Sequence, residues 1–199
     1  MFRFSKTFVA TAATVGLMPF YLSLGKPVAC ESQKEDAATL AMWAGRWSKQ
    51  MTGWHQKAEH HTLAKYADSV LKGRRSVLVP LCGKTVDLTT LALRGHDVLG
   101  VEGIHKAIIE YSIENCTTID LDPMRSTGEY GPKFDSYVGR MKEGGKVELL
   151  KGDFFDLPTI GLERVDAVWD RASIVAINPS LRREYVDCIG HVLKSGGII

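Results

Sequence analysis

The chain has 199 residues, of which 45% are hydrophobic and 24% are charged, and its formal net charge is +2. This composition is typical of a globular domain with one buried core, and it excludes disordered and collagen-like proteins. A leading segment without acids holds Arg3, Lys6 and Lys26, so the remaining basic and acidic residues nearly balance. This balance gives no indication of a nucleic-acid partner.

The four cysteines are widely spread, without a CxxC pair or a Cys/His pair at metal-ligand spacing. They are Cys30, Cys82, Cys116 and Cys188. We therefore expect reduced thiols, with no disulfide framework and no metal site.

Residues 1–30 are expected to form a targeting or anchoring segment. Residues 7–24 are largely apolar, follow a short basic start and precede the first acid, Glu31. This pattern favours a mitochondrial presequence. A secretory signal ending near Cys30, a membrane anchor, and a disordered tail on a cytoplasmic protein are the alternatives. The folded domain is then expected to occupy residues 31–199.

Helical and strand patterns alternate along this domain. A helix is predicted over 37–50, and a second from near Trp54 to Leu71 with Leu63, Tyr66 and Val70 on one face. Strands are predicted at 76–80, 96–102, 146–151 and 164–169, and helices at 86–93, 105–115 and from 179 to just before 196. The Gly- and Pro-rich stretch 117–145 is predicted to be a long excursion with a short hairpin.

Strands that alternate with helices predict an α/β fold with a doubly wound, mostly parallel, Rossmann-like sheet. Another strand is only begun at Ile198 and Ile199. We therefore expect the sequence to be truncated after the fourth strand and the helix that follows it.

The segment from Ser76 to Leu88 passes from a buried strand to a helix across a single glycine, Gly83. Parallel sheets bind ligands at such strand ends, where free backbone N–H groups and a helix N-terminus meet. The G-x-G-x-x-G motif of dinucleotide enzymes and the P-loop motif are both missing here. The loop therefore favours an adenosyl ligand without phosphate, with S-adenosylmethionine as the candidate, over NAD.

Glu102 lies 19 residues after Gly83, at the end of the second predicted strand. Rossmann-like domains hold a ribose through a carboxylate at this position. The alternative is a solvated acid or one that caps the next helix.

Asp153 follows the third predicted strand and precedes Phe154 and Phe155. This placement suits contacts with an adenine ring, and the alternative is a turn cap beside two core residues. Arg171 follows the fourth strand directly after Asp170. It either pairs with Asp170, or stabilises an anionic nucleophile or the carboxylate of the cofactor.

Three tryptophans, Trp43, Trp47 and Trp54, fall within twelve residues before the sheet. The spacing of the first two is typical of a buried helix stripe, but tryptophan faces also attract cations, and a sulfonium is a cation. We expect these tryptophans to form a lid over the site, and of the six histidines His55 lies beside it in the sequence.

Six segments between Leu40 and Leu193 resemble signature segments of the thiopurine S-methyltransferase family. They are Trp43-x-x-x-Trp47, Gly53-Trp54-His55, the Pro80–Lys84 segment PLCGK, the segment from Gly95 to Glu102, the Gly152–Leu157 segment GDFFDL, and the segment from Trp169 to Pro179. The resemblance implies a class I methyltransferase fold that binds S-adenosylmethionine and methylates a small-molecule thiol.

The resemblance also implies roles for individual residues. For the cofactor these are Trp43, Trp47 and Trp54 as its cover, Leu81 and Gly83 in its loop, Glu102 at the ribose, and Asp153 and Phe154 at the adenine. Arg171 would be the catalytic residue between cofactor and acceptor, and Trp54 would also face the acceptor. The family's remaining acceptor contacts are expected beyond Ile199.

The sequence departs from the family pattern at two places. Gly103 stands where a hydrophobic residue is common, which predicts a looser contact with the adenine. The N-terminal extension is foreign to the cytosolic members of the family. Membrane contact is expected, if at all, through residues 7–24.

Three other functions remain open on these residues. One is methylation of a halide or a metalloid on the same fold, and another is cofactor binding without catalysis. NAD-dependent oxidation is the third, and the missing glycine motif counts against it.

Overall fold

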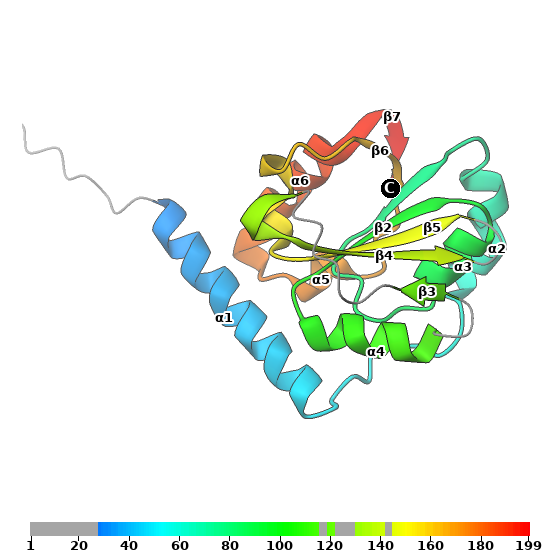
Figure 1. Cartoon of the computed structure of the whole chain (residues 1–199). Coiled ribbons are helices and arrows are strands. Elements are labelled where there is room, and N and C mark those ends of the chain that lie inside the picture. The colour runs from blue at the N-terminus through cyan, green and yellow to red at the C-terminus, as the bar shows by residue number, and fades with distance from the viewer. Residues whose placement is uncertain (1–27, 116–118, 122–129, 142–144) are drawn as a thin grey trace, which may run out of the picture.

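The computed structural model describes residues 28–115, 119–121, 130–141 and 145–199 (Figure 1). The predicted targeting segment lies outside the described residues except for its last three, 28–30, which begin a helix. Within the described ranges, no helix is long and apolar enough to cross a membrane.

Seven strands of the described chain form one sheet in the order β3-β4-β5-β2-β1-β6-β7. Their bounds are β1 Ser76–Val79, β2 Asp97–Glu102, β3 Ile119–Leu121, β4 Asp135–Met141, β5 Lys146–Lys151, β6 Val165–Val168 and β7 Leu193–Ile198. The five strands from β5 to β7 run parallel, and β4 and β3 add an antiparallel edge beside β5. The prediction of a doubly wound, mostly parallel sheet is confirmed.

Helices cover both faces of this sheet (Figure 1). Their bounds are α1 Val28–Ser48, α2 His61–Val70, α3 Asp87–Leu93, α4 His105–Asn115, α5 Ser173–Ala176 and α6 Arg182–Val192, with short 3₁₀ turns at Gly131–Lys133, Phe154–Thr159 and Pro179–Leu181. Buried side chains of α2, α3 and α4 pack with Val77 and Val79 of β1, whereas those of α6 pack with Leu78. Successive strand residues thus serve opposite faces, as the pleat requires.

The start and the buried face of α2 differ from the prediction. The helix begins at His61, because His60 has extended backbone and its ring accepts a hydrogen bond from the N–H of Thr62, which caps the first turn. Ala67, one residue after Tyr66, faces the core together with Leu63, while Tyr66 is 46% exposed. Residues 49–60 instead form turns that bring Trp54 back toward α1.

Two strands extend further than the sequence analysis expected. β4 lies inside the stretch 117–145 and pairs with β5 from Asp135 to Arg140, which is more than a short hairpin. β7 begins at Leu193, where the sequence pattern predicts the last turn of a helix, so the described fold continues past the fourth parallel strand. Gly196, with φ of 74°, and a shift in register beside β6 explain why no alternating pattern marks this strand.

Candidate functional site

Two hollows lie at opposite ends of the parallel strands. The first, of about 540 Å³, lies at the carboxyl ends of β1, β2, β5 and β6, and we call it the carboxyl-edge cavity. The second, of about 430 Å³, lies at the amino ends of β1 and β2, and we call it the amino-edge hollow. Parallel α/β sheets bind ligands at the carboxyl ends of their strands. The polar contacts described below agree with this rule.

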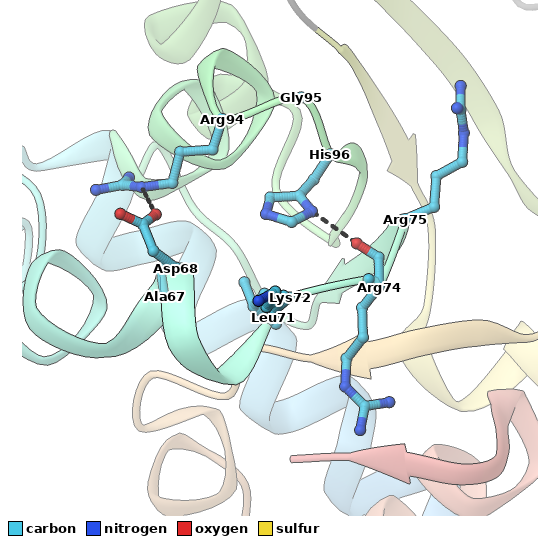
Figure 2. Close-up of a pocket in the computed structure, with 10 residues that line it drawn as sticks. Ala67, Asp68, Leu71, Lys72, Arg74, Arg75, Arg94, Gly95 and His96 are labelled. Atoms are coloured by element: carbon cyan, nitrogen blue, oxygen red, sulfur yellow. Dashed lines mark hydrogen bonds and ion pairs between the residues drawn. The ribbon is translucent and has the colours of Figure 1, made fainter.

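The amino-edge hollow has basic walls, and the guanidinium groups of its three arginines already have partners. Figure 2 shows the side chains of Arg74 and Arg75 pointing away from each other and that of Arg94 paired with Asp68. The Nδ1 atom of His96 lies 3.0 Å from the carbonyl oxygen of Arg74. These contacts, which we call the brace, stabilise the start of the strands, so the hollow is a weak candidate for an anion site.

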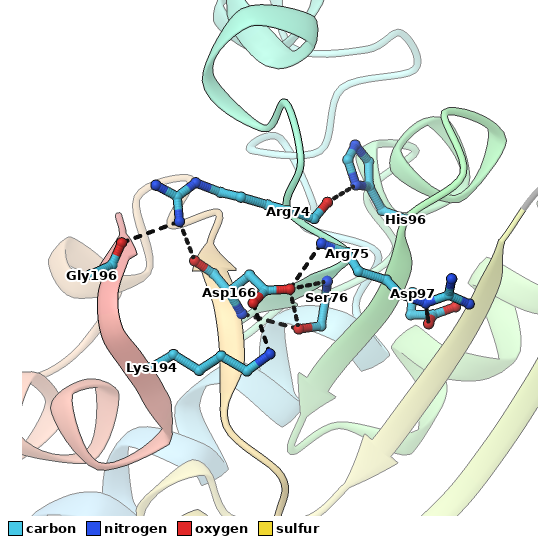
Figure 3. Close-up of polar contacts among 8 residues, drawn as sticks. All are labelled: Arg74, Arg75, Ser76, His96, Asp97, Asp166, Lys194 and Gly196. Atoms are coloured by element: carbon cyan, nitrogen blue, oxygen red, sulfur yellow. Dashed lines mark hydrogen bonds and ion pairs between the residues drawn. The ribbon is translucent and has the colours of Figure 1, made fainter.

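Asp166 is the centre of this brace (Figure 3). Its carboxylate accepts hydrogen bonds from Lys194, from the backbone N–H groups of Arg75 and Ser76, and from the hydroxyl of Ser76. Lys194 above all, together with these donors, holds the pKa of Asp166 well below its usual range. The brace therefore joins β1, β6 and β7 at the edge away from the carboxyl-edge cavity.

The loop after β1 forms the floor of the carboxyl-edge cavity and has unusual backbone geometry. Leu81 and Gly83 both have positive φ, at 44° and 56°. Non-glycine residues rarely adopt this conformation, and such strain is commonly found at functional sites. Between them, Cys82 is a buried free thiol whose pKa is raised well above its ordinary value by burial and then by Glu102.

Glu102 ends β2 under this loop and is 6% exposed. Its Oε2 atom accepts the N–H of Gly83 at 2.8 Å, and its Oε1 atom accepts the N–H of Ile104 at 2.7 Å. Burial raises the pKa of Glu102 to about 7, although these backbone donors act in the opposite direction. Each oxygen keeps a lone pair for a further donor, so the carboxylate is able to accept two ligand hydroxyls.

Three tryptophans close one side of the cavity as an edge-to-face cluster. Trp54 lies 5.0 Å from Trp43 and 6.0 Å from Trp47 between ring centroids. Trp47 is 3% exposed and packs against Ile104 and Ala107, so α1 is anchored on α4. A Cβ atom at Gly83 would lie 3.4 Å from the Trp47 ring, so the cluster rests directly on the loop after β1.

Asp153 and Phe154 line the cavity after β5, but each also has a structural contact. The Oδ1 atom of Asp153 accepts the N–H of Phe155 and caps the turn that follows, as the alternative interpretation stated. Phe154 is 2% exposed and packs on Tyr185 at 4.9 Å between ring centroids. The Oδ2 atom of Asp153 accepts no hydrogen bond within the described ranges and is the group left for a ligand.

Leu40 of α1 occupies the space beside Gly103. A Cβ atom at position 103 would lie 2.6 Å from the Cδ1 atom of Leu40. The space that a side chain at 103 would need is thus filled by another element. The sequence contains no signal for this exchange, because α1 is far from β2 in the chain.

Arg171 does not pair with Asp170. Asp170 instead accepts hydrogen bonds from the N–H of Ser173 and the hydroxyl of Tyr185. One guanidinium nitrogen of Arg171 donates to the carbonyl oxygen of Trp54 at 3.4 Å, and its Nε atom lies 4.0 Å from Asp87. Arg171 therefore borders the cavity and joins β6 to the tryptophan cluster.

Asp87 is a structural residue of the site that the sequence analysis missed. It is 1% exposed, and its carboxylate accepts the N–H of His60 and the Nε1–H of Trp169, both at 2.9 Å. An acid in the first turn of a helix reads from sequence as a solvated cap, so no pattern marked it as buried. It links the segment before α2 to the end of β6.

The nine residues predicted to bind cofactor or acceptor all line the carboxyl-edge cavity. They are Trp43, Trp47, Trp54, Leu81, Gly83, Glu102, Asp153, Phe154 and Arg171. The structure thus brings together residues from four strand ends, from α1 and from the turns that follow α1, while their individual roles stay predictions.

A parallel sheet with a one-glycine loop after its central strand and a buried carboxylate at the end of the next strand defines a Rossmann-like domain of the methyltransferase class. The solved structure of the DhpI–SAH complex shares this fold, with a TM-score of 0.50 and 15% identity over 83% of this chain and 68% of that one. The chain belongs to the thiopurine S-methyltransferase family, because the family model described as Thiopurine S-methyltransferase matches residues 38–199.

Curated relatives agree with this assignment. The chain is 34% identical over 168 residues to thiopurine S-methyltransferase of Bos taurus and 36% identical over 169 residues to that of Oryctolagus cuniculus. Each match covers 83% of this chain and 66% of the relative. The probable thiopurine S-methyltransferase of Yarrowia lipolytica is 36% identical over 152 residues, or 76% of this chain and 67% of the relative. The chain thus spans about two thirds of the length of these relatives.

Proposed function

We propose that this chain carries the cofactor-binding part of an S-adenosylmethionine-dependent methyltransferase that acts on small-molecule thiols. The observation that carries the proposal is a cavity that joins the buried carboxylate of Glu102, the tryptophan cluster and the guanidinium of Arg171 at the carboxyl edge of the sheet. The names of the curated relatives supply the acceptor class.

The residues of the cavity fit an adenosyl ligand. We assign Glu102 to the ribose hydroxyls and Asp153 to the adenine amino group, and the support is that each carboxylate lines the cavity and keeps acceptor capacity beside its backbone hydrogen bonds. The tryptophan cluster offers aromatic faces to a cation, and the loop after β1 lacks the glycines that a pyrophosphate requires. S-Adenosylmethionine supplies an electrophilic methyl group on a sulfonium.

The chain's own residues would align and shield the transfer rather than take part in covalent chemistry. The tryptophan cluster excludes water, and a dry site favours a reaction in which a thiolate charge and a sulfonium charge disappear together. Arg171 borders the same cavity and provides a cation that holds the thiolate before the methyl group moves.

Calorimetric titration of the full chain with S-adenosylmethionine and, separately, with NAD tests the cofactor. We expect heat with the first and none with the second, and the reverse result would overturn the proposal. Methyl transfer to a panel of aromatic, heterocyclic and aliphatic thiols, with iodide and arsenite in parallel, then tests the acceptor class. Binding without any transfer would identify a non-catalytic cofactor-binding protein.

The leading segment has a separate proposed role, which is to direct the protein to mitochondria. Its support is the basic start, the apolar stretch 7–24 and the lack of acids before Glu31. A fluorescent protein fused behind residues 1–30 should colocalise with a mitochondrial dye, and secretory or cytoplasmic fluorescence would contradict this.

A further inference from the structure

A histidine, His55, borders the carboxyl-edge cavity next to the tryptophan cluster. Its side chain is 13% exposed, and its backbone N–H donates to the carbonyl oxygen of Thr52 at 2.9 Å. The carbonyl of the preceding residue, Trp54, accepts the hydrogen bond from Arg171. Two hydrogen bonds, one from the backbone N–H of His55 and one to the carbonyl oxygen of Trp54, therefore fix the turn that carries the imidazole.

Charged groups from three elements surround this imidazole. The Nε2 atom of His55 lies 3.7 Å from the Oε2 atom of Glu114 on α4, whose other oxygen accepts Nζ of Lys84 at 2.6 Å. Glu110 of α4 accepts the same Lys84 ammonium at 2.9 Å. Burial and Lys84, with a smaller effect of Arg171, lower the pKa of His55, while Glu114 and Glu110 raise it. The net shift is downward from 6.5, so the ring is a neutral base at pH 7.

We propose that His55 accepts the proton of thiol acceptors that are not ionised at neutral pH, an inference that rests on the proposed methyl transfer. The S–H bond breaks as the proton moves to the imidazole nitrogen that does not face Glu114, and the electron pair stays on sulfur. This thiolate sulfur then forms the bond to the methyl carbon while the carbon–sulfur bond of the sulfonium breaks. The products are a methyl sulfide, neutral S-adenosylhomocysteine and an imidazolium that later releases its proton to water.

The groups around His55 suit both the acceptance of the proton and the stabilisation of the imidazolium. The Nδ1 atom has no hydrogen-bond partner among the described residues, so it is free to accept once Nε2 carries the proton. Glu114 lies against Nε2 and stabilises the imidazolium that forms. Arg171 is permanently protonated and therefore stabilises a thiolate without being able to create one.

The dependence on thiol acidity separates this role from simple binding. A thiol with a pKa of about 8.5 is only a few per cent ionised at pH 7 and needs a base, whereas a thiol with a pKa of about 5 is already a thiolate. General bases contribute about 10²- to 10⁴-fold to rates. Loss of His55 should therefore slow transfer to weakly acidic thiols and spare acidic ones.

The test compares wild-type chain, His55→Gln and the control His191→Gln, which changes an exposed histidine at the end of α6. Values of kcat/KM are measured at pH 7 for thiols with pKa values from about 5 to about 10. We expect His55→Gln to lose about 100-fold with thiols above pKa 8 and less than about threefold with those below pKa 6. His191→Gln should match wild type throughout.

A second variant guards against a purely structural effect. His55→Ala should regain transfer to weakly acidic thiols when imidazole is added, and both His55 variants should keep S-adenosylmethionine affinity by calorimetry. A loss of equal size across the whole panel, or no loss at any thiol pKa, would overturn the role of His55. If wild-type chain binds the cofactor yet methylates none of the thiols, the proposed function itself fails, which is a distinguishable result.

Discussion

Gly83 donates its backbone N–H to the Oε2 atom of Glu102 at 2.8 Å, so the loop after β1 and the end of β2 close on each other. The carboxylate that is proposed to bind the ribose thus also fixes the loop after β1. This arrangement buries Glu102 and raises its pKa to about 7, which places its ionisation in the physiological range. Cofactor binding should therefore depend on pH.

The first prediction concerns this pH dependence. Ribose hydroxyls donate to the ionised carboxylate, so lowering the pH from 8 to 6 should weaken S-adenosylmethionine affinity by up to about tenfold. Calorimetry in two buffers of different ionisation enthalpy should also show proton release on binding near pH 6. Glu102→Gln should bind weakly with a flat pH profile, and a wild-type affinity that is equal at pH 6 and 8 would contradict the prediction.

The stability of the free protein should respond to Glu102 in the opposite direction. A group whose pKa is raised on folding contributes stability below its unfolded pKa of 4.5, and this contribution is lost as the pH rises through about 7. The increase in Tm caused by saturating cofactor should therefore be larger at pH 8 than at pH 5. Thermal unfolding with and without cofactor at the two pH values measures this increase in Tm.

The second prediction concerns Arg171, which contacts the carbonyl oxygen of Trp54 and lies near Asp87. Arg171→Met should lower kcat/KM by about 10²- to 10³-fold, because a cation in the cavity and the link to the tryptophan cluster are both lost. Arg183→Met, on an exposed position of α6, is the control and should behave as wild type. Wild-type kinetics in Arg171→Met would remove this residue from the catalytic hypothesis.

The third prediction compares two glycines. A Cβ atom at Gly100 in β2 would lie 2.6 Å from Leu149 and 2.9 Å from the sulfur of Cys82, so Gly100→Ala should destabilise the fold by about 1–3 kcal/mol. Gly45 of α1 has open space around its Cβ position, so Gly45→Ala should stabilise by up to about 1 kcal/mol. Urea unfolding measures both, and equal effects would contradict the packing argument.

The fourth prediction concerns Asp166 in the brace at the amino edge. Asp166→Asn should cost about 1–2 kcal/mol of unfolding free energy at pH 7, because one acceptor of four donors is weakened. The pKa of this acid is lowered on folding, so its contribution is present above the unfolded value of 3.8 and disappears as the pH falls below it. The variant and wild type should therefore converge at low pH, and cofactor affinity should stay unchanged.

The sequence analysis predicted the central strands and the residues at their carboxyl ends because those signals are local. Buried apolar runs mark β1, β2 and β5, and the acid or glycine after each run marks the ligand edge. The helix α4 was predicted with its observed bounds for the same reason. A fold built from strand–helix repeats places these ends together without any further information.

The misses have physical causes that no local pattern carries. β7 contains Gly196 and Gly197 and owes its strand structure to its neighbour β6. α2 starts at a histidine cap, which is not among the usual capping residues. Asp87 and Leu40 act through contacts across the fold, with Trp169 and Gly103 respectively. Such tertiary contacts become visible only when the elements are assembled.

Ala172 shows how one backbone angle joins sequence to site. It follows Arg171 with φ of 67°, a conformation in which glycine is the least strained residue. This left-handed residue is the N-cap of the short helix α5, which begins at Ser173. The strain is stored beside the arginine that borders the cavity, where rigidity serves positioning.

Cys82 places a thiol of the protein inside a site that is proposed to bring a methyl donor to thiols. Its burial under the loop and the neighbouring Glu102 keep it protonated, because both raise its pKa well above the ordinary value. A protonated thiol is a poor nucleophile, so under the proposed function Cys82 would resist methylation and the formation of mixed disulfides with thiol acceptors. The same packing that shapes the loop after β1 thus keeps its own thiol in the unreactive form.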